Sequence, residues 1–147
     1  MTIPIEGIDH IVVMASDIER SLDFYKGVLG GEAIFEKAFR QGKIAVLPVR
    51  VGKAVINLQR LDDPAYIVAN RLEAGTVDLC FRWGTTIQEA INWLKEKGIE
   101  IIEGPVPRPA ANGVWGKSIY FRDPDGNLLE LLTTLEQSEP IPEFTAS

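Results

Sequence analysis

The sequence has a single cysteine, no long apolar run and few basic residues. With Cys80 as the only cysteine among 147 residues, the chain forms no internal disulfide, and a Cys-based zinc site, which needs at least two thiolates, is excluded. No apolar stretch approaches the roughly 20 residues that span a bilayer, and residues 1–6 lack the basic and apolar parts of a secretion signal. These absences predict a cytoplasmic protein without a membrane partner.

Basic residues are outnumbered by acidic ones. The 15 Lys and Arg against 21 Asp and Glu give a net charge of −6 and an isoelectric point of about 4.8. Nucleic acids and anionic membranes attract basic surfaces, so this charge argues against both as partners. The remaining composition, 46% hydrophobic and 24% charged, is typical of a globular domain and excludes disorder, collagen-like repeats and coiled coil.

Two segments repeat one pattern 68 positions apart. Residues 7–14 and 75–82 are rich in apolar and β-branched side chains, which predicts a strand in each. A capping box follows each strand, starting at Ser16 in the first half and at Thr86 in the second, and predicts the start of a helix. The helix stripes that we expect to be buried are Ile18, Leu22, Tyr25 and Leu29 in the first half and Ile87, Ala90, Ile91 and Leu94 in the second.

Further strand-like stretches follow each helix. They cover residues 33–39, 44–51 and 53–59 in the first half and residues 99–103, 117–122 and 127–134 in the second. The predicted fold class is therefore α+β, with two βαβββ modules in tandem at about residues 7–60 and 75–135. We expect a single domain over residues 1–135, in which the two sheets form a curved, partly open barrel around a ligand-sized concavity. Residues 60–74 would form a linker with a short helix, and residues 136–147 a tail with little to bury.

Strand alternation places four polar side chains in equivalent positions of the two halves. His10 corresponds to Asp78, and Asn57 corresponds to Glu130. Apolar runs flank each of them, and burying a polar group costs free energy unless it has a partner or a metal ion. Simpler roles remain open, because a single strand histidine is more often a hydrogen-bonded core residue, Asp78 could cap a turn and Glu130 could face solvent. Cys80 fits a small buried hydrophobe better than a nucleophile, since no basic neighbour or helix start is evident for it.

Two longer motifs carry a resemblance to a known family. Residues 9–30 begin with D-H-I-V-V, and residues 120–131 read Y-F-R-D-P-D-G-N-L-L-E-L. Together they resemble the vicinal oxygen chelate superfamily, which includes glyoxalase I, fosfomycin-resistance thiol transferases, methylmalonyl-CoA epimerase, extradiol dioxygenases and bleomycin-resistance proteins. The resemblance spans about residues 7–135 and looks closest to a subgroup known only as glyoxalase-domain proteins.

The resemblance implies paired βαβββ modules with one divalent metal ion on a concave face. His10 matches the first-strand histidine ligand of the family, and Glu130 matches its last-strand carboxylate ligand. Asp78 stands where many members have a second histidine, and Asn57 where glyoxalase I has a glutamate that serves as ligand and base. The implied ligands are His10, Asp78 and Glu130, whose oxygen-rich chemistry favours Mn²⁺ or Mg²⁺, with Fe²⁺ and Ni²⁺ also open, over Zn²⁺.

The two departures from the family pattern weigh against two of its activities. An amide cannot accept a substrate proton, so Asn57 argues against glyoxalase I activity. Extradiol dioxygenases hold iron with two histidines and a carboxylate, and His10 is the only histidine in this sequence. Proton transfer would then fall to Glu130, with Asp78 and a metal-bound hydroxide as the next candidates, while Asn57 would orient a substrate oxygen or water.

Other polar and aromatic residues are candidates for substrate contact. Arg82, Tyr120 and Trp115 are predicted to line the site and to hold an anionic or oxygen-rich substrate. Residues 106–117, with Arg108 and Trp115, would form either a lid or a solvated connector.

Three functions are compatible with these residues. The leading prediction is a metal-dependent enzyme of the lyase, isomerase or transferase type that chelates two neighbouring oxygens of a small substrate. The alternatives are an extradiol-type dioxygenase and a metal-free binding or sequestering protein of the bleomycin-resistance kind, in which Trp83 and Trp115 would grip a planar ligand. We also expect a homodimer, because the resembling proteins cover exposed sheet edges with a second subunit.

Overall fold

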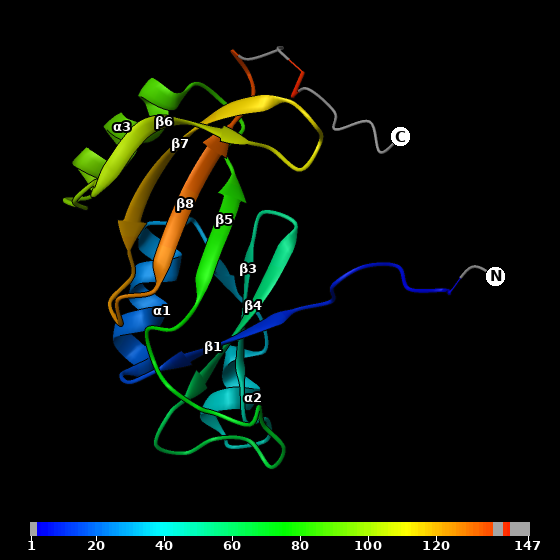
Figure 1. Cartoon of the computed structure of the whole chain (residues 1–147). Coiled ribbons are helices and arrows are strands. Elements are labelled where there is room, and N and C mark those ends of the chain that lie inside the picture. The colour runs from blue at the N-terminus through cyan, green and yellow to red at the C-terminus, as the bar shows by residue number, and fades with distance from the viewer. Residues whose placement is uncertain (1–2, 137–139, 142–147) are drawn as a thin grey trace. The chain divides into compact units, whose positions relative to one another are not determined.

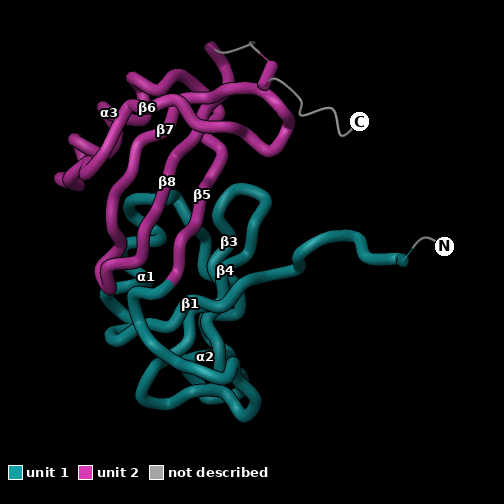
Figure 2. The backbone as a smooth tube through the Cα atoms, in the orientation of Figure 1, with its two compact units in different colours: residues 1–76 teal, residues 77–147 magenta. Residues whose placement is uncertain are grey.

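The computed structural model describes residues 3–136 and 140–141 and divides the chain into two compact units, residues 1–76 and 77–147 (Figure 2). In each unit a helix packs on one face of a four-stranded sheet (Figure 1). Most of the predicted tail, residues 136–147, lies outside the described residues. In the part of the chain that is described, none of the helices has the length and apolar character needed to cross a membrane.

The first unit contains, in chain order, β1 (Ile11–Ala15), α1 (Ile18–Gly27), β2 (Glu32–Ala33), α2 (Glu36–Arg40), β3 (Leu47–Val51) and β4 (Ala54–Arg60). Its strands lie in the order β1-β4-β3-β2, with β1 parallel to β4 and the other neighbours antiparallel. Ile18, Leu22 and Tyr25 of α1 are buried as predicted, whereas Leu29 lies beyond the end of the helix and is half-buried. The helix packs against β3 and β4, and so closes the apolar face of the sheet.

The second unit contains β5 (Asp78–Arg82), α3 (Ile87–Glu96), β6 (Glu103–Pro109), β7 (Trp115–Arg122) and β8 (Leu128–Thr133). Its strand order is β5-β8-β7-β6, and β5 runs parallel to β8. Ile87, Ala90 and Leu94 of α3 are buried and pack against β7 and β8. The largest buried side chains of this sheet are Ile119, Phe121 and Leu129.

The two sheets share one topology, which confirms the predicted pair of βαβββ modules. In both, the strand before the long helix pairs in parallel with the last strand, as a crossover connection through a helix allows. The pairs Val12–Asn57 and Cys80–Glu130 occupy equivalent places in the two registers. Neither sheet closes into a barrel, so each keeps two edge strands.

The starts of the long helices follow the predicted capping residues closely. Thr86 caps α3, and its side chain accepts a hydrogen bond from the Glu89 backbone N–H at 3.2 Å. In α1 the cap is Asp17, not Ser16, because the Asp17 carboxylate accepts from the Arg20 backbone N–H at 3.1 Å. The first helix therefore begins one residue later than the capping box predicts.

The prediction of a strand over residues 33–39 is wrong. Strand β2 ends at Ala33, and α2 begins at Glu36 and continues to Arg40. Helix α2 buries Phe39, which also stacks against the Arg60 guanidinium 4.4 Å from its ring centre. Arg40 and Glu36 lie one turn apart in this short helix and form an ion pair that stabilises it, with Arg40 Nε 3.0 Å from the Glu36 carboxylate. Tertiary contacts of Phe39 thus override the local apolar pattern.

Two further boundaries differ from expectation. Strand β6 begins at Glu103, where the predicted stretch 99–103 ends, and continues to Pro109. The predicted lid, residues 106–117, is therefore mostly a β-hairpin between β6 and β7, with only residues 110–114 outside the two strands. The predicted linker, residues 60–74, forms no helix: β4 ends at Arg60, and residues 61–77, all of them described, lead to β5 without a helix or strand.

The turn between β7 and β8 is tied together by buried polar side chains. Asp123 Oδ1 accepts from the backbone N–H groups of Asp125 and Asn127, each at 2.9 Å, and its Oδ2 accepts from the Asn127 side-chain amide at 2.7 Å. The Asn127 amide oxygen in turn accepts from the backbone N–H of Val77 at 2.9 Å. This bond holds the start of β5 against β8, so the predicted turn also positions a strand that carries candidate site residues.

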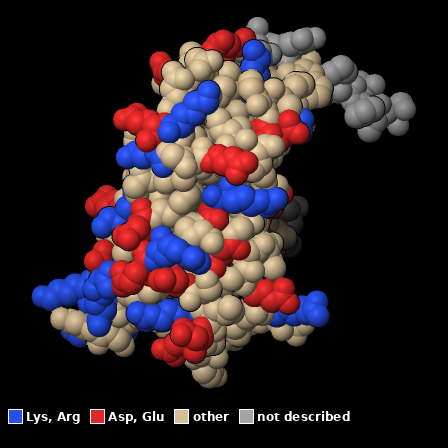
Figure 3. Space-filling view, turned by 90° about the vertical axis from the view of Figure 1, so that its left-hand side faces the viewer, with Lys and Arg blue, Asp and Glu red and all other residues tan. Residues whose placement is uncertain are grey.

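Charged side chains of both signs are interspersed over the face of the molecule shown in Figure 3. On this face Lys and Arg do not form one continuous patch.

Candidate functional site

Glu130 lies at the centre of a polar row that crosses the second sheet. It is the Cα partner of Cys80 on the parallel neighbour β5 and of Tyr120 on the antiparallel neighbour β7. Opposed residues in a sheet point to the same side, so the three side chains share the face opposite α3. Glu130 and Tyr120 are both half-buried there.

Cys80 is exposed, which corrects the prediction of a buried residue, although its sulfur is partly shielded from solvent. Burial raises its pKa to about 12, and the negative charge of Glu130 and hydrogen bonding to that carboxylate add to the effect, while Arg82 opposes it. A thiol with such a pKa holds very little thiolate at neutral pH and is a poor nucleophile. Cys80 is therefore better suited to donate a hydrogen bond to Glu130 than to attack a substrate.

Arg108 extends this polar row to β6. Its Nε donates to the Tyr120 hydroxyl at 2.8 Å, and its guanidinium lies 5.4 Å from the centre of the Tyr120 ring. Burial raises the pKa of Tyr120. Arg108 lowers this pKa and Glu130 raises it further. The row Arg108, Tyr120, Glu130 and Cys80 thus joins all four strands of the sheet through polar side chains.

The sequence predicts Arg108 in a lid or a solvated connector, and the structure places it on the edge strand β6. The signal was present in the alternation of β6, where Gly104, Val106 and Arg108 are half-buried between exposed prolines. Proline lacks the N–H that a central strand needs, so three prolines in alternate positions are typical of an edge strand. The half-buried positions between them then point to Arg108 as a residue of the sheet face.

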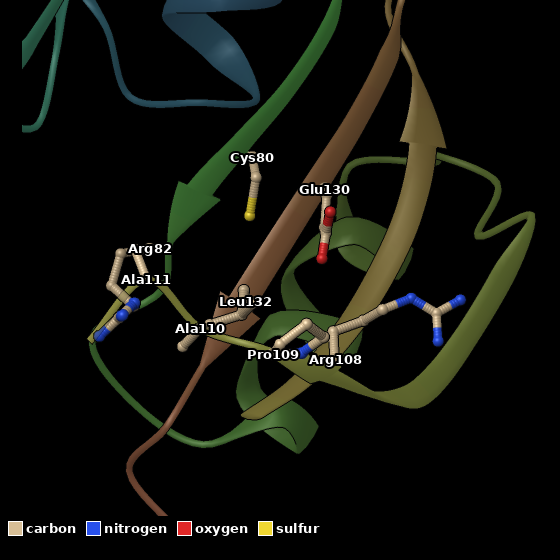
Figure 4. A pocket seen from close by; sticks show the side chains of 8 residues that line it. All are labelled: Cys80, Arg82, Arg108, Pro109, Ala110, Ala111, Glu130 and Leu132. Carbon is tan, nitrogen blue, oxygen red and sulfur yellow. The ribbon is translucent and has the colours of Figure 1, made fainter. Parts of the chain in front are cut away.

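A pocket of about 590 Å³ opens on this face of the second sheet (Figure 4). Polar side chains from three strands reach it, Arg82 from β5, Glu130 from β8 and Arg108 from β6. The other lining residues are Cys80, Pro109, Ala110, Ala111 and Leu132. The volume is in the usual range of small-molecule sites, which runs from roughly 300 to 1,000 Å³.

Arg82 is held at the pocket by two uncharged acceptors. Its Nη1 donates to the Thr134 hydroxyl at 3.3 Å and its Nη2 to the Asn112 amide oxygen at 3.4 Å. Asn112 belongs to the turn of the β6–β7 hairpin, so this turn contributes to the site by orienting Arg82. Trp115 does not line the pocket, because strand alternation puts it on the face of Ile119 and Phe121, which α3 covers.

In the first unit the corresponding position on the sheet is that of Asn57. His10 directly precedes β1, and its Nδ1 lies 2.7 Å from the Asp9 carboxylate. Asn57 is buried, with 8% of its surface exposed, and pairs with Val12 on β1 and Pro48 on β3. Gln59 is its neighbour on the same face, where its amide lies 3.5 Å from the Met14 sulfur. The register places Asn57 beside Val12 and Gln59 beside Met14, whereas His10 precedes the paired residues of β1.

The predicted metal ligands divide between the units, His10 in the first and Asp78 and Glu130 in the second. The donor chemistry fits a divalent ion, since a proton on Nδ1 shared with Asp9 leaves Nε2 of His10 as a lone-pair donor. Asp78 begins β5 on the face of Glu130 and is exposed. Within either unit, the described residues include no group of three His, Cys, Asp or Glu side chains that could hold a metal ion.

Comparison with known proteins decides the family. A sequence profile of the Glyoxalase/Bleomycin resistance protein/Dioxygenase superfamily matches residues 7–131. The chain belongs to this superfamily. The resemblance inferred from the two motifs is thereby confirmed.

Relatives within the superfamily support the same assignment over most of the chain. Virulence protein STM3117 of Salmonella typhimurium is 40% identical over 127 residues, which cover 86% of this chain and 83% of that protein. The metallothiol transferase FosB of Staphylococcus epidermidis is 31% identical over 130 residues, with coverage of 88% and 82%. The solved structure of the integron cassette protein VCH_CASS1 from the V. cholerae mobile metagenome has 35% identity and a TM-score of 0.80, and the match covers 90% of this chain and 98% of that one.

Proposed function

We propose that this superfamily member is a metal-dependent enzyme that acts on a small oxygen-rich substrate. The observation that carries the proposal is the position of Glu130, a half-buried carboxylate between two hydrogen-bonding neighbours on the open face of the second sheet. A carboxylate held in this way can serve as a metal ligand or a proton acceptor without being neutralised by an ion pair. The likeness to a protein named metallothiol transferase supports the metal dependence.

His10, Asp78 and Glu130 are the residues proposed to hold the ion. One imidazole and two carboxylates favour Mn²⁺ or Mg²⁺, with Fe²⁺ and Ni²⁺ as further choices, over Zn²⁺. When bound, a divalent ion supplies Lewis acidity toward substrate oxygens. Asp9 would orient His10, because a carboxylate on the far ring nitrogen fixes the ring and its tautomer.

Proton transfer is proposed to use Glu130 and not Asn57. The Asn57 amide can orient a substrate oxygen by hydrogen bonding but cannot accept a proton. Glu130 has this capacity, and Cys80 and Tyr120 fix its position on either side. Arg82 and Tyr120 are proposed as substrate contacts, which makes a lyase, isomerase or transferase outcome depend on how the substrate lies against them.

A metal-free binding protein is the second candidate. It is favoured by the apolar side of the pocket, which is formed by Pro109, Ala110 and Leu132. An extradiol-type dioxygenase is the weaker alternative, because the sequence has one histidine where that iron site uses two. We also propose a homodimer, in which a second subunit covers exposed sheet edges; light scattering at micromolar concentration would show a monomer if this is wrong.

Metal binding by the chelator-treated full chain tests the proposal. Calorimetric titration with Mn²⁺, and separately with Mg²⁺, Ni²⁺, Fe²⁺ and Zn²⁺, should show binding of one ion per chain for at least one metal. Substitutions His10→Ala and Glu130→Gln should each abolish binding, because each removes a ligand.

The matched control is Glu100→Gln, an exposed carboxylate outside the site, which should bind as the parent does. No binding of any of the five ions would reject the metal-dependent enzyme in favour of the binding protein. Binding that survives His10→Ala would show that the ligand set is wrong.

A further inference from the structure

The pocket of the second unit is lined by two arginines and one glutamate, so its lining has a net positive charge. Arg82 and Arg108 both line it, and among the described residues neither forms an ion pair with an acidic side chain. Arg82 bonds to Thr134 and Asn112, and Arg108 bonds to the Tyr120 hydroxyl and to the Pro107 carbonyl, at 2.8 Å in both cases. Every one of these acceptors is uncharged. The two guanidinium groups are therefore held in place by uncharged partners, without a direct ion pair.

Each arginine also has N–H groups that its protein partners do not use. A guanidinium has five N–H donors, and each of these two uses only two of them on its protein partners. The bonds of Arg82 are long for N–H···O contacts, which centre near 2.9 to 3.0 Å, so a stronger acceptor can displace them at small cost. A carboxylate or phosphonate is such an acceptor, because charge-assisted bonds to arginine are roughly twice as strong as neutral ones.

The negative charge of Glu130 does not cancel this field. Glu130 lies beside Cys80 and Tyr120, its partners on the two neighbouring strands. In Figure 4 the Arg82 and Arg108 guanidinium groups lie toward opposite ends of the pocket, with Pro109, Ala110 and Leu132 between them. The lining thus combines two cationic ends, one carboxylate and an apolar side, and its formal charge is positive.

We propose that this pocket binds a small organic anion, whose acidic group pairs with Arg82 and whose apolar part rests on Leu132 and Ala110. Arg108, held more firmly by its short bonds to Tyr120 and Pro107, contributes positive potential from the other end. The inference names the substrate class of the proposed enzyme and rests on that proposal only in treating the pocket as its substrate site. Every residue that it uses belongs to the second unit, and it needs no metal ion.

A titration with butyrate and its neutral isostere butyramide tests the proposal. Backbone amide NMR spectra of the chelator-treated full chain should shift saturably with butyrate at residues 80–82, 110–113 and 130–132, and should not do so with butyramide. Arg82→Gln should weaken butyrate binding at least about tenfold. Arg108→Gln should weaken it by less, and Arg122→Gln, an exposed arginine bonded to the Gly126 carbonyl outside the pocket, should leave it unchanged.

A second variant keeps Arg82 in place and changes only its counter-charge. Asn112→Asp puts a carboxylate next to Arg82 and should compete with butyrate, whereas Asn70→Asp, the same change in the exposed linker, should not. The proposal is overturned if butyrate and butyramide bind alike, or if both Arg82→Gln and Asn112→Asp leave binding unchanged. Mn²⁺ binding without butyrate binding would reject this inference and keep the proposed enzyme, and butyrate binding without binding of any of the five ions would do the reverse.

Discussion

The two sheets place different chemistry at the same position of the same register. In the first sheet the central side chain is Asn57, which is buried beside Val12 and Pro48. In the second it is Glu130, which is half-buried between Cys80 and Tyr120. A neutral amide tolerates burial beside Val12 and Pro48. A carboxylate needs hydrogen-bond donors and partial exposure, which Glu130 has between Cys80 and Tyr120. The repeated backbone determines where a side chain lies, and the neighbours on adjacent strands determine what it can do.

The turn that precedes the last strand is held by buried side-chain hydrogen bonds in the second unit. Asn127→Ala removes buried bonds to Asp123 and to the Val77 N–H, and we expect a loss of about 3 kcal/mol in the free energy of unfolding. The corresponding turn of the first unit holds Lys53, which is exposed, so Lys53→Ala should change stability by less than about 0.5 kcal/mol. Urea unfolding followed by circular dichroism measures both, and equal effects would contradict this account of the turn.

Placing a glutamate at the central position of the first sheet tests whether that position tolerates a carboxylate. Asn57→Glu places a carboxylate among Val12 and Pro48, and we expect it to destabilise the protein by about 2 kcal/mol at neutral pH. Burial would raise the pKa of the new carboxyl above its unfolded value, so the penalty shrinks as the pH falls and the group is protonated. Thermal unfolding from pH 7 to pH 5 should show the difference narrowing, and Asn57→Gln is the uncharged control. A penalty that stays constant with pH would mean that the position is open enough to hydrate the charge.

The smallest expected effect concerns the only thiol. Because Glu130 helps to raise the pKa of Cys80, Glu130→Gln should lower that pKa and increase the thiolate fraction at a given alkaline pH. Alkylation by iodoacetamide should become several-fold faster, and it should stay slower than for a free thiol because burial, the largest cause of the shift, remains. Arg82→Gln should act in the opposite direction, since that arginine lowers the pKa of Cys80. An unchanged alkylation rate in both variants would show that neither Glu130 nor Arg82 affects the pKa of Cys80.

Much of the fold follows from local patterns in the sequence. Helix caps at Asp17 and Thr86 and buried stripes of period 3.6 depend on neighbours within one or two turns, so they predict α1 and α3 closely. The exception at residues 33–39 has a tertiary cause, because Phe39 is buried by the sheet and by Arg60, which is 21 positions away in the chain. Strand β6 was placed too early for a related reason, since an edge strand with three prolines has little local signature of its own.

The sequence by itself determined the two-module topology, the superfamily and the faces on which Asn57 and Glu130 lie. These depend on alternation, on caps and on the repeat, all of which are properties of short stretches of chain. Only the tertiary structure decided that Tyr120 and Cys80 flank Glu130, that Arg108 belongs to the sheet and that Trp115 does not line the pocket. Such neighbours come from strands 10 to 50 positions apart, and their register is set by packing and hydrogen bonding across the whole sheet, which no local pattern encodes.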